Sequence, residues 1–296
     1  MNRDRAKPAL SVVISTVAAP DAVLRSRQDL IKQVAAAEGE LIIITGASKT
    51  SSLATPGVRV HAMPDASIFD CRAQGLRLAS GDIVALTEDH CIPATDWCAR
   101  ILQNFSTWPD LVLLGGAVIN ASNERIEDLM NYWMTFATFA PGQVVATHPC
   151  VAQFIIRASV VRRQLDPGEL EDKLIKKFET IPGAIRVDPE LRIRHVQSHG
   201  FWKTFAMHYH NGRATGGFSV RRVNGGDLSM WTSLRWAWID TQAHLRRTAR
   251  AFRAAHRSML AITGYCLLIS PLVLAHGIGE LVGYHNGPGD SPARLL

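Results

Sequence analysis

Residues 79–90 read Ala-Ser-Gly-Asp-Ile-Val-Ala-Leu-Thr-Glu-Asp-His, and this stretch decides the fold prediction. Five apolar or β-branched residues follow a glycine and an aspartate, and three side chains that can bind a metal ion close the stretch. Such an apolar run is typical of a buried strand in a sheet that is covered on both faces. Ligands bind beyond the carboxyl ends of the strands in sheets of this kind. The stretch therefore predicts a strand over Ile83–Thr87 with a candidate site where it ends.

The pattern around this strand predicts an α/β fold. Further buried strands are predicted over Ser11–Val17, Leu41–Thr45, Val58–Ala62 and Leu111–Ile119. Helices are predicted over Asp21–Ala37, over Ser67–Ser80 with Gly81 as its C-cap, and over Thr95–Phe105. Strands that alternate with helices indicate a mostly parallel sheet with right-handed crossovers. The second half is less regular, with helices predicted over Asn123–Phe139, Gly168–Thr180 and Met230–Arg257 and strands over Phe154–Arg157 and Asp188–Arg194.

Composition narrows the class of protein. The chain has 296 residues, of which 47% are hydrophobic and 20% charged, and this excludes a disordered or fibrous protein. The first nine residues are polar and charged and do not resemble a signal peptide. The five cysteines show no Cys-x-x-Cys spacing, so they suit a reducing compartment and argue against a disulfide scaffold or a structural zinc site.

Charge is unevenly distributed along the chain. The formal net charge is +6, and residues 200–257 alone hold 10 basic and 2 acidic side chains. The next 22 positions, 258–279, contain no lysine, arginine, aspartate or glutamate. A basic segment beside an apolar run indicates attachment to an anionic membrane surface, with the arginines and the preceding α/β domain cytoplasmic. It argues against a nucleic-acid-binding protein, because no recognised binding motif accompanies it. A kinked span, a monotopic anchor and a buried hairpin in a soluble protein all remain open.

The residues that end the decisive stretch form a candidate metal site. Alternate residues of an extended chain point the same way, so Glu88 and His90 can converge on one ion while Asp89 points elsewhere. A carboxylate and an imidazole suit Mn²⁺ or Mg²⁺, with phosphate oxygens completing the coordination shell. The alternative is a solvated acidic turn, and the apolar strand before it favours the metal site.

Several stretches together resemble glycosyltransferase family 2. They are Arg72-Ala73-Gln74-Gly75-Leu76, the stretch from Ala79 to His90, Ser11–Thr16, Glu40–Ile44, and Trp97 shortly after Pro93. The resemblance covers roughly residues 10–105, and it is looser over 145–215. It implies a GT-A fold with a nucleotide-binding α/β sheet, followed here by a C-terminal helical membrane-associated segment. It also implies transfer of a sugar from a nucleotide-sugar to an acceptor hydroxyl with inversion, assisted by a divalent metal.

The resemblance assigns roles to particular residues. It assigns donor binding to Ser15, Thr16, Thr45, Ser48, Arg72, Glu88 and Asp89, and metal binding to Glu88 and His90. The family's second strand ends in aspartates, whereas this chain has Thr45-Gly46-Ala47-Ser48, whose hydroxyls can still hydrogen-bond a ribose or a base. Thr45 in place of an acid favours the alternative function, a non-catalytic membrane protein with a GT-A-like fold that binds a nucleotide or a partner.

The remaining site residues come from the second half of the chain. The family pattern implies an acidic catalytic base at a helix start, which favours Asp172 with Glu171 as its alternative, although acids also stabilise a first helical turn by themselves. The loop and strand around Gln153 resemble the acceptor side, and the membrane segment makes a lipid-linked acceptor a candidate. His195 and His199 either approach the donor phosphates or end a strand as structural residues.

Four segments are expected from these observations. They are a GT-A domain over residues 1–225, a basic helical segment over 226–257, a hydrophobic membrane segment over 258–284 and a tail over 285–296.

Overall fold

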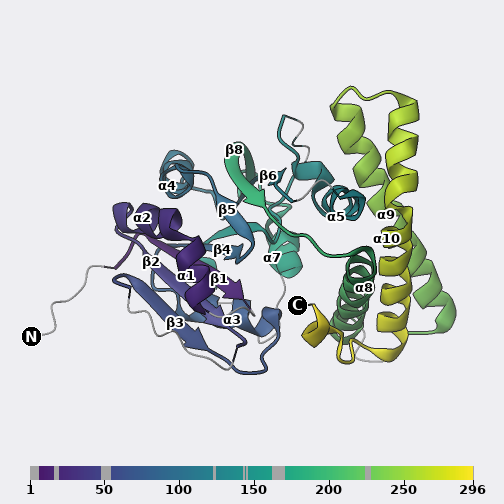
Figure 1. Ribbon diagram of the computed structural model, residues 1–296, viewed down its shortest axis with the longest axis horizontal. Coiled ribbons are helices and arrows are strands. Elements are labelled where there is room, and N and C mark those ends of the chain that lie inside the picture. Colours follow the sequence, from purple (N-terminus) through teal and green to yellow (C-terminus); the bar gives the residue numbers. More distant parts are fainter. Residues whose placement is uncertain are drawn as a thin grey trace, which may run out of the picture. The chain divides into compact units, whose positions relative to one another are not determined.

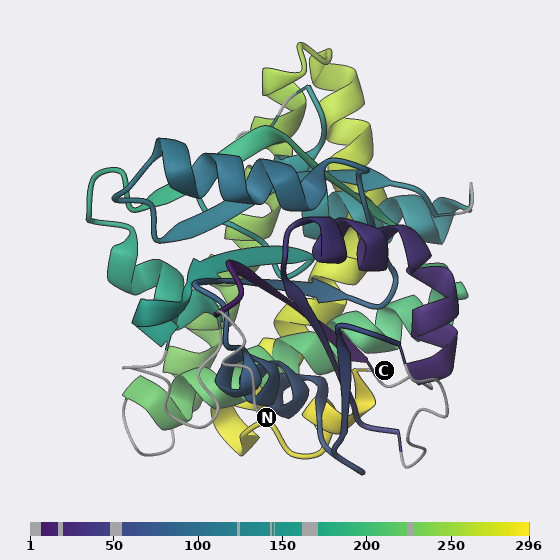
Figure 2. The ribbon, with the colours of Figure 1, turned by 90° about the vertical axis from the view of Figure 1, so that its left-hand side faces the viewer.

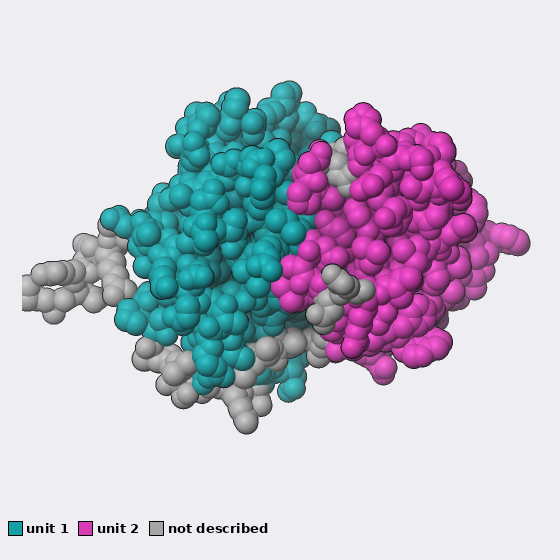
Figure 3. Space-filling model, turned by 45° about the horizontal axis from the view of Figure 1, so that its top comes forward, with its two compact units in different colours: residues 1–119, 146–195 teal, residues 120–145, 196–296 magenta. Residues whose placement is uncertain are grey.

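The computed structural model describes residues 7–16, 20–47, 55–122, 125–142, 144, 146–161, 171–223 and 228–295. The chain divides into two compact units, which Figure 3 shows in different colours. The first unit comprises residues 1–119 and 146–195, and the second comprises residues 120–145 and 196–296. The first contains the sheet, and the second is mainly helical.

The sheet of the first unit follows the predicted strands (Figure 1). Its strands are β1 Leu10–Thr16, β2 Glu40–Thr45, β3 Val58–Ala62, β4 Ile83–Glu88, β5 Cys91–Pro93, β6 Leu113–Asn120, β7 Gln153–Arg157 and β8 Ile185–His195. They are ordered β3-β2-β1-β4-β7-β6-β8-β5. Strands β3, β2, β1 and β4 run parallel, β7 runs antiparallel to β4 and β6, and β5 runs antiparallel to β8. The predicted α/β fold with a mostly parallel, GT-A-like sheet is confirmed.

Helices cover both faces of this sheet, as the apolar strands require. They are α1 Pro20–Ser26, α2 Gln28–Ala36, α3 Ile68–Leu78, α4 Trp97–Thr107, α6 Ala158–Val161 and α7 Glu171–Phe178. Because side chains alternate along a strand, Val12 and Ile14 pack in one core with α2 and α4, whereas Val13 packs in a second core with α3 and α7. Figure 2 shows α4 and α3 on opposite sides of the strands.

Three local features differ from the sequence prediction. The helix predicted over Asp21–Ala37 is two helices, α1 and α2, separated at Arg27. The side chain of Arg27 donates a hydrogen bond to the backbone carbonyl of Asp89. The helix α3 has Ala79 as its C-cap, whereas Gly81 lies against β1 and donates its backbone N–H to the Ser11 hydroxyl at 2.8 Å. Strand β5 is only three residues long, which is too short to give a periodic signal.

The second unit is a group of helices. They are α5 Ile126–Phe136, the 3₁₀ turn η1 Ala137–Phe139, α8 Phe201–Val223, α9 Met230–Ala254, α10 Met259–Asn286 and the 3₁₀ turn η2 Ser291–Arg294. Helix α8 runs parallel to α10, because Tyr209 lies against Gly279 and Arg213 lies against Gly283. Helix α9 runs antiparallel to α10, because the Tyr284 hydroxyl donates to Asp240 at 2.9 Å near one end and the rings of Phe252 and Tyr265 stack near the other.

Glycines bring α8 and α10 into direct backbone contact. A Cβ atom at Gly279 would lie 2.1 Å from the carbonyl oxygen of Tyr209, and one at Gly283 would lie 2.3 Å from the carbonyl oxygen of Arg213. Small residues four apart on a helix allow such close packing in membranes and in water alike. The side of α10 that carries these glycines is therefore covered by α8.

The opposite side of α10 is apolar and exposed. By length and composition, α10 could cross a membrane, although a core helix of a soluble protein meets the same test. Leu260, Leu267 and Leu274 are seven residues apart and more than half exposed. Trp231 and Trp238 on α9 show the same spacing, with 82% and 64% of their surface exposed. Residues seven apart lie on one face of a helix, so each helix presents an apolar outer stripe.

Candidate metal and donor site

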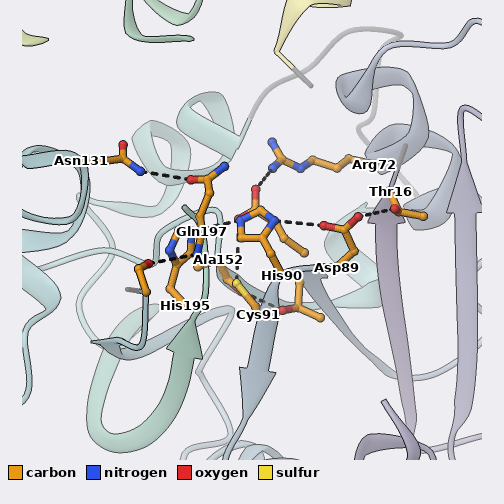
Figure 4. A network of polar contacts seen from close by, with 12 residues as sticks. Thr16, Arg72, Asp89, His90, Cys91, Asn131, Ala152, His195 and Gln197 are labelled. Atoms are coloured by element: carbon orange, nitrogen blue, oxygen red, sulfur yellow. Dashed lines mark hydrogen bonds and ion pairs between the residues drawn. The ribbon is translucent and has the colours of Figure 1, made fainter. Parts of the chain in front are cut away.

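The site begins at the carboxyl end of β4, between β1 and β7. Ser15 of β1 is the register partner of Glu88, the last residue of β4. Beyond this point the chain turns and enters β5 at Cys91, so Asp89 and His90 form the connection between two strands. The predicted position of the site, at the end of the apolar strand, is where these polar side chains gather (Figure 4).

Arg72 and His90 share the carboxylate of Glu88. The Arg72 guanidinium, on α3, donates to Oε1 of Glu88. Oε2 lies 3.2 Å from Nε2 of His90. Burial alone would raise the pKa of Glu88, but His90 and Arg72 outweigh it and hold that pKa well below its usual range. Glu88 is therefore held ionised, with Oε1 bonded to Arg72 and Oε2 facing His90.

Asp89 orients the imidazole of His90. Its Oδ1 lies 3.0 Å from Nδ1 of His90, and its Oδ2 accepts from the hydroxyl of Thr16. Nε2 of His90 thereby faces Glu88 and His195. Burial alone would lower the pKa of His90, but Glu88 and Asp89 outweigh it and raise that pKa to about 9. A carboxylate behind a ligating histidine is a common arrangement at metal sites, where it sets the tautomer.

His195 completes this group, and sequence reasoning had left its role open. Strand β5 pairs antiparallel with β8, and Cys91 is the register partner of His195. The pairing brings Nε2 of His195 to 3.0 Å from Nε2 of His90, although the two residues are 105 positions apart. The sequence showed a histidine at the end of a predicted strand. It did not show that the short strand β5 pairs with that strand and brings His195 next to His90.

These residues fit a divalent cation. Glu88, His90, Cys91 and His195 each offer a ligand atom, and these atoms lie within 4.8 Å of one another. Nδ1 of His90 faces Asp89, and its Nε2 faces the carboxylate of Glu88 and a second imidazole. A cation that displaced the proton of Nε2 would be faced by this nitrogen, by the carboxylate and by His195 together. The carboxylate suits Mn²⁺ or Mg²⁺, and the imidazoles suit divalent transition metals such as Zn²⁺ and Fe²⁺.

The hydroxyls assigned to the donor lie on β1 and β2. Ser15 and Thr16 are buried, and Oγ of Ser15 has no hydrogen-bond partner among the described residues. Oγ1 of Thr45 accepts from the backbone N–H of Ala47 at 3.0 Å, so it stabilises the turn after β2. Ser48 lies outside the described residues. The hydroxyls therefore line the same sheet edge as Glu88, which is the placement that the sequence predicted for Ser15, Thr16 and Thr45.

Arg27 belongs to this site and was missed in the sequence. Its guanidinium donates to the backbone carbonyl of Asp89 from the break between α1 and α2. Burial lowers its pKa, against the raising effect of Cys91 and Asp89. No residue pattern around Arg27 pointed to this contact, because it joins segments 62 positions apart.

Gln153 is a structural residue, which corrects its assignment to the acceptor. Its side chain has 0% exposed surface. Oε1 accepts from the indole N–H of Trp97 at 3.1 Å, and Nε2 donates to the carbonyls of Ala117 and Leu191 at 2.8 and 3.3 Å. The amide is used to join β7 to its neighbours, so it has no surface with which to contact an acceptor.

The predicted catalytic base lies in α7. Glu171 and Asp172 are the first residues of this helix that the structure describes, because residues 162–170 lie outside the described part of the chain. Their side chains lie outside the described residues, so their role stays a prediction.

Comparison with known proteins agrees with this fold. The sequence model of Glycosyl transferase family 2 matches residues 11–164, which is more than half of the chain. A mannosyltransferase from Pyrobaculum calidifontis, solved with GDP-Man and Mn²⁺, is similar in structure with a TM-score of 0.54 and 15% identity, over 94% of this chain and 88% of that one. Glucosyl-3-phosphoglycerate synthase from Mycobacterium tuberculosis, solved with Mn²⁺, UDP and phosphoglyceric acid, has a TM-score of 0.46 and 17% identity, over 69% and 75%. No curated protein matches this sequence.

Proposed function

The chain belongs to glycosyltransferase family 2, and we propose that it transfers a sugar from a nucleotide-sugar to an acceptor hydroxyl with inversion, with a divalent cation held by Glu88, His90 and His195. The observation that carries the proposal is the convergence of these three side chains at the carboxyl edge of the sheet. Nucleotides bind at that edge in α/β folds. The mannosyltransferase that shares the fold was solved with a nucleotide-sugar and Mn²⁺, which supports the same class of donor and metal here.

The residues around the cation have separate tasks. When bound, a divalent ion would neutralise the donor diphosphate and stabilise the leaving nucleotide as a Lewis acid. Arg72 fixes Glu88 through Oε1 and leaves Oε2 to the ion. Asp89 holds the tautomer of His90, and Thr16 in turn holds Asp89. Ser15, the register partner of Glu88 on the neighbouring strand, is the donor-binding candidate next to the proposed ligand Glu88.

Asp172 is the proposed general base, with Glu171 as the alternative. In an inverting transfer the acceptor oxygen forms a bond to the anomeric carbon as the bond from that carbon to the phosphate oxygen breaks. The base takes the acceptor hydroxyl proton during this step, and the departing electron pair stays on the diphosphate. The family pattern, which places an acidic pair on a helix in this part of the chain, supports this role, and both acids lie in α7.

We also propose that the second unit attaches to an anionic membrane in the plane of its surface. The exposed leucines of α10 and the tryptophans of α9 supply the apolar contact. Arg246, Arg250 and Arg253 of α9 are exposed and can pair with anionic headgroups. Each arginine near such a surface contributes about 1 kcal/mol, and burying a leucine contributes roughly 1.5–3 kcal/mol. A surface-attached enzyme has access to lipid-linked acceptors, which makes them the first acceptors to test.

The transfer is tested by a donor screen that measures nucleoside diphosphate release with Mn²⁺ or Mg²⁺. We expect one nucleotide-sugar to be turned over by the wild type, and His195→Ala to lose metal stimulation while its circular dichroism spectrum stays unchanged. Full metal-stimulated activity in His195→Ala would contradict the site. Nucleotide binding without any turnover across donors would favour the non-catalytic alternative.

Membrane attachment is tested by flotation with phosphatidylglycerol or phosphatidylcholine vesicles. We expect the wild type to float with the anionic vesicles and the double variant Leu260→Gln, Leu267→Gln to remain in solution, because these leucines lie on the outer stripe of α10. Trp108→Gln, at an exposed tryptophan of the first unit, is the matched control and should float like the wild type. Equal flotation of both variants would contradict the proposed surface.

A further inference from the structure

Cys91 lies among the three proposed cation ligands, and the function proposed above gives it no role. Its Sγ is 3.9 Å from Oε2 of Glu88, which is 3.2 Å from Nε2 of His90, and that atom is 3.0 Å from Nε2 of His195. The ligand atoms of all four residues lie within 4.8 Å of one another. Two of the ligands come from strands, β5 and β8, that are distant in the sequence. Spacing rules based on Cys-x-x-Cys pairs therefore gave no sign of the cluster.

Three of the six distances between ligand atoms in this cluster are close to those of a tetrahedral site, and the others do not exceed 4.8 Å. Zinc binds imidazole nitrogen at about 2.0–2.1 Å and cysteine sulfur at about 2.3 Å. The edges of a tetrahedron are about 1.6 times the bond length, so roughly 3.3 Å separates two nitrogens and roughly 3.6 Å separates sulfur from a nitrogen or oxygen. The three observed separations, 3.0, 3.2 and 3.9 Å, lie within a few tenths of an ångström of these values.

We propose that Glu88, His90, Cys91 and His195 form a four-ligand site for Zn²⁺ or a similar thiophilic divalent cation. The Cys91 thiol loses its proton, and Nε2 of His90 loses its proton, to solvent as the bonds to the metal form, because ligands must be deprotonated to coordinate. One carboxylate, one thiolate and two neutral imidazoles then balance the double charge of the ion. Asp89 is already placed to hold the His90 ring for coordination.

This second mode of binding opposes the proposed function, which rests on the same cluster. Three protein ligands leave coordination positions for phosphate oxygens, whereas four fill a tetrahedral shell, as in structural zinc sites. Thiolate and imidazole also favour Zn²⁺ over Mn²⁺ and Mg²⁺. Zinc bound through Cys91 therefore excludes the diphosphate, and this makes the cluster a zinc-sensitive switch on donor binding.

Cobalt is the probe for the first test, because tetrahedral Co²⁺ absorbs visible light strongly and a thiolate ligand adds a near-ultraviolet charge-transfer band. The full-length wild type is titrated with Co²⁺ alone, and we expect both absorptions at one equivalent. Cys91→Ser should lose the charge-transfer band. Cys266→Ser, at a cysteine on α10, is the matched control and should keep it. A wild-type spectrum without the thiolate band overturns the proposal whether or not either variant folds.

Zinc affinity and nucleotide binding provide the second test. Loss of a residue that only supports a ligand costs about 10- to 100-fold in metal affinity. Because Cys91 is a proposed ligand, Cys91→Ser should lower the Zn²⁺ affinity by more than this. Zinc-loaded wild type should bind UDP and GDP at least tenfold more weakly than Mn²⁺-loaded protein, and Cys91→Ser should reduce that difference. Equal nucleotide binding by the two metal forms overturns the switch. Neither the spectrum nor this titration uses a sugar donor, so failure of the proposed transfer reaction is distinguishable from failure of the zinc site.

Discussion

Removal of the Asp89 carboxylate should weaken metal binding without touching a ligand. Asp89 holds Nδ1 of His90 at 3.0 Å through one oxygen and bonds Thr16 through the other, so the ring orientation depends on it. Loss of such a partner typically costs about 10- to 100-fold in metal affinity, or about 1.4–2.7 kcal/mol. We expect Asp89→Ala to fall in this range. Asp89→Asn should fall near its lower limit, because the amide oxygen still accepts a hydrogen bond but carries no charge.

The assay for this prediction is a Mn²⁺ titration followed by electron paramagnetic resonance, which detects the free ion. Asp110→Ala is the matched control, because Asp110 lies in an exposed turn of the same unit and should bind Mn²⁺ like the wild type. Wild-type affinity in Asp89→Ala would refute the reasoning that His90 is held for coordination by its neighbour. Comparison of the two variants is a second check, because equal losses of affinity in both would mean that an accepting oxygen at position 89 does not hold the ring.

Three further predictions concern the helices, pH and the base. Gly279→Ala should lower the free energy of unfolding in denaturant by about 1–3 kcal/mol, because the new Cβ would lie 2.1 Å from a backbone oxygen. A Cβ at Gly264 on the same helix would meet no atom within 4 Å, so Gly264→Ala should be neutral or stabilise the protein by up to about 1 kcal/mol. Equal stability of the two variants would contradict the contact between α8 and α10. The pKa of His90 is raised from 6.5 to about 9. The stability that His90 contributes to the metal-free protein is therefore fully present below pH 6.5 and is lost as the pH rises through about 9. A melting temperature that does not fall between pH 6.5 and about pH 9 would contradict the interaction of His90 with Glu88 and Asp89. Asp172→Asn should abolish transfer and spare donor binding, measured by product formation and calorimetry, and an active Asp172→Asn beside an inactive Glu171→Gln would move the base to the neighbour.

The strands were predictable because their signal is local. Apolar runs of five to seven residues predicted β1, β2 and β4 to within about a residue at most ends, since a strand covered on both faces needs apolar side chains at nearly every position. Strand β3 was predicted with the same accuracy, although its sequence Val-Arg-Val-His-Ala alternates and its residues are only partly buried or exposed. The position of Glu88 at the end of β4 followed from the same signal, and the convergence of Glu88 and His90 followed from the alternation of side chains along an extended chain.

The features that sequence reasoning missed depend on distant contacts. Arg27 breaks a continuous helical pattern because its side chain bonds to the carbonyl of Asp89, which no local rule could anticipate. His195 enters the site through a three-residue strand. Helix α8 was missed because Gly212 and Gly216 lower its helical propensity, and their role becomes visible only when α10 lies against them. Gln153 resembled a ligand residue, but its amide is used inside the sheet.

The close packing of α8 on α10 changes what kind of anchor the C-terminal segment can be. A membrane anchor that hangs from a domain can be cut off and leave that domain intact. Helix α10 instead supplies Ile269, Leu272 and Val273 to a core shared with α5, and its glycines form the surface on which α8 lies. Deleting it would expose that core and leave α8 without a partner. The proposed membrane attachment and the folding of the second unit therefore depend on the same helix. A change that weakens lipid binding without unfolding the unit must lie on the outer stripe of α10.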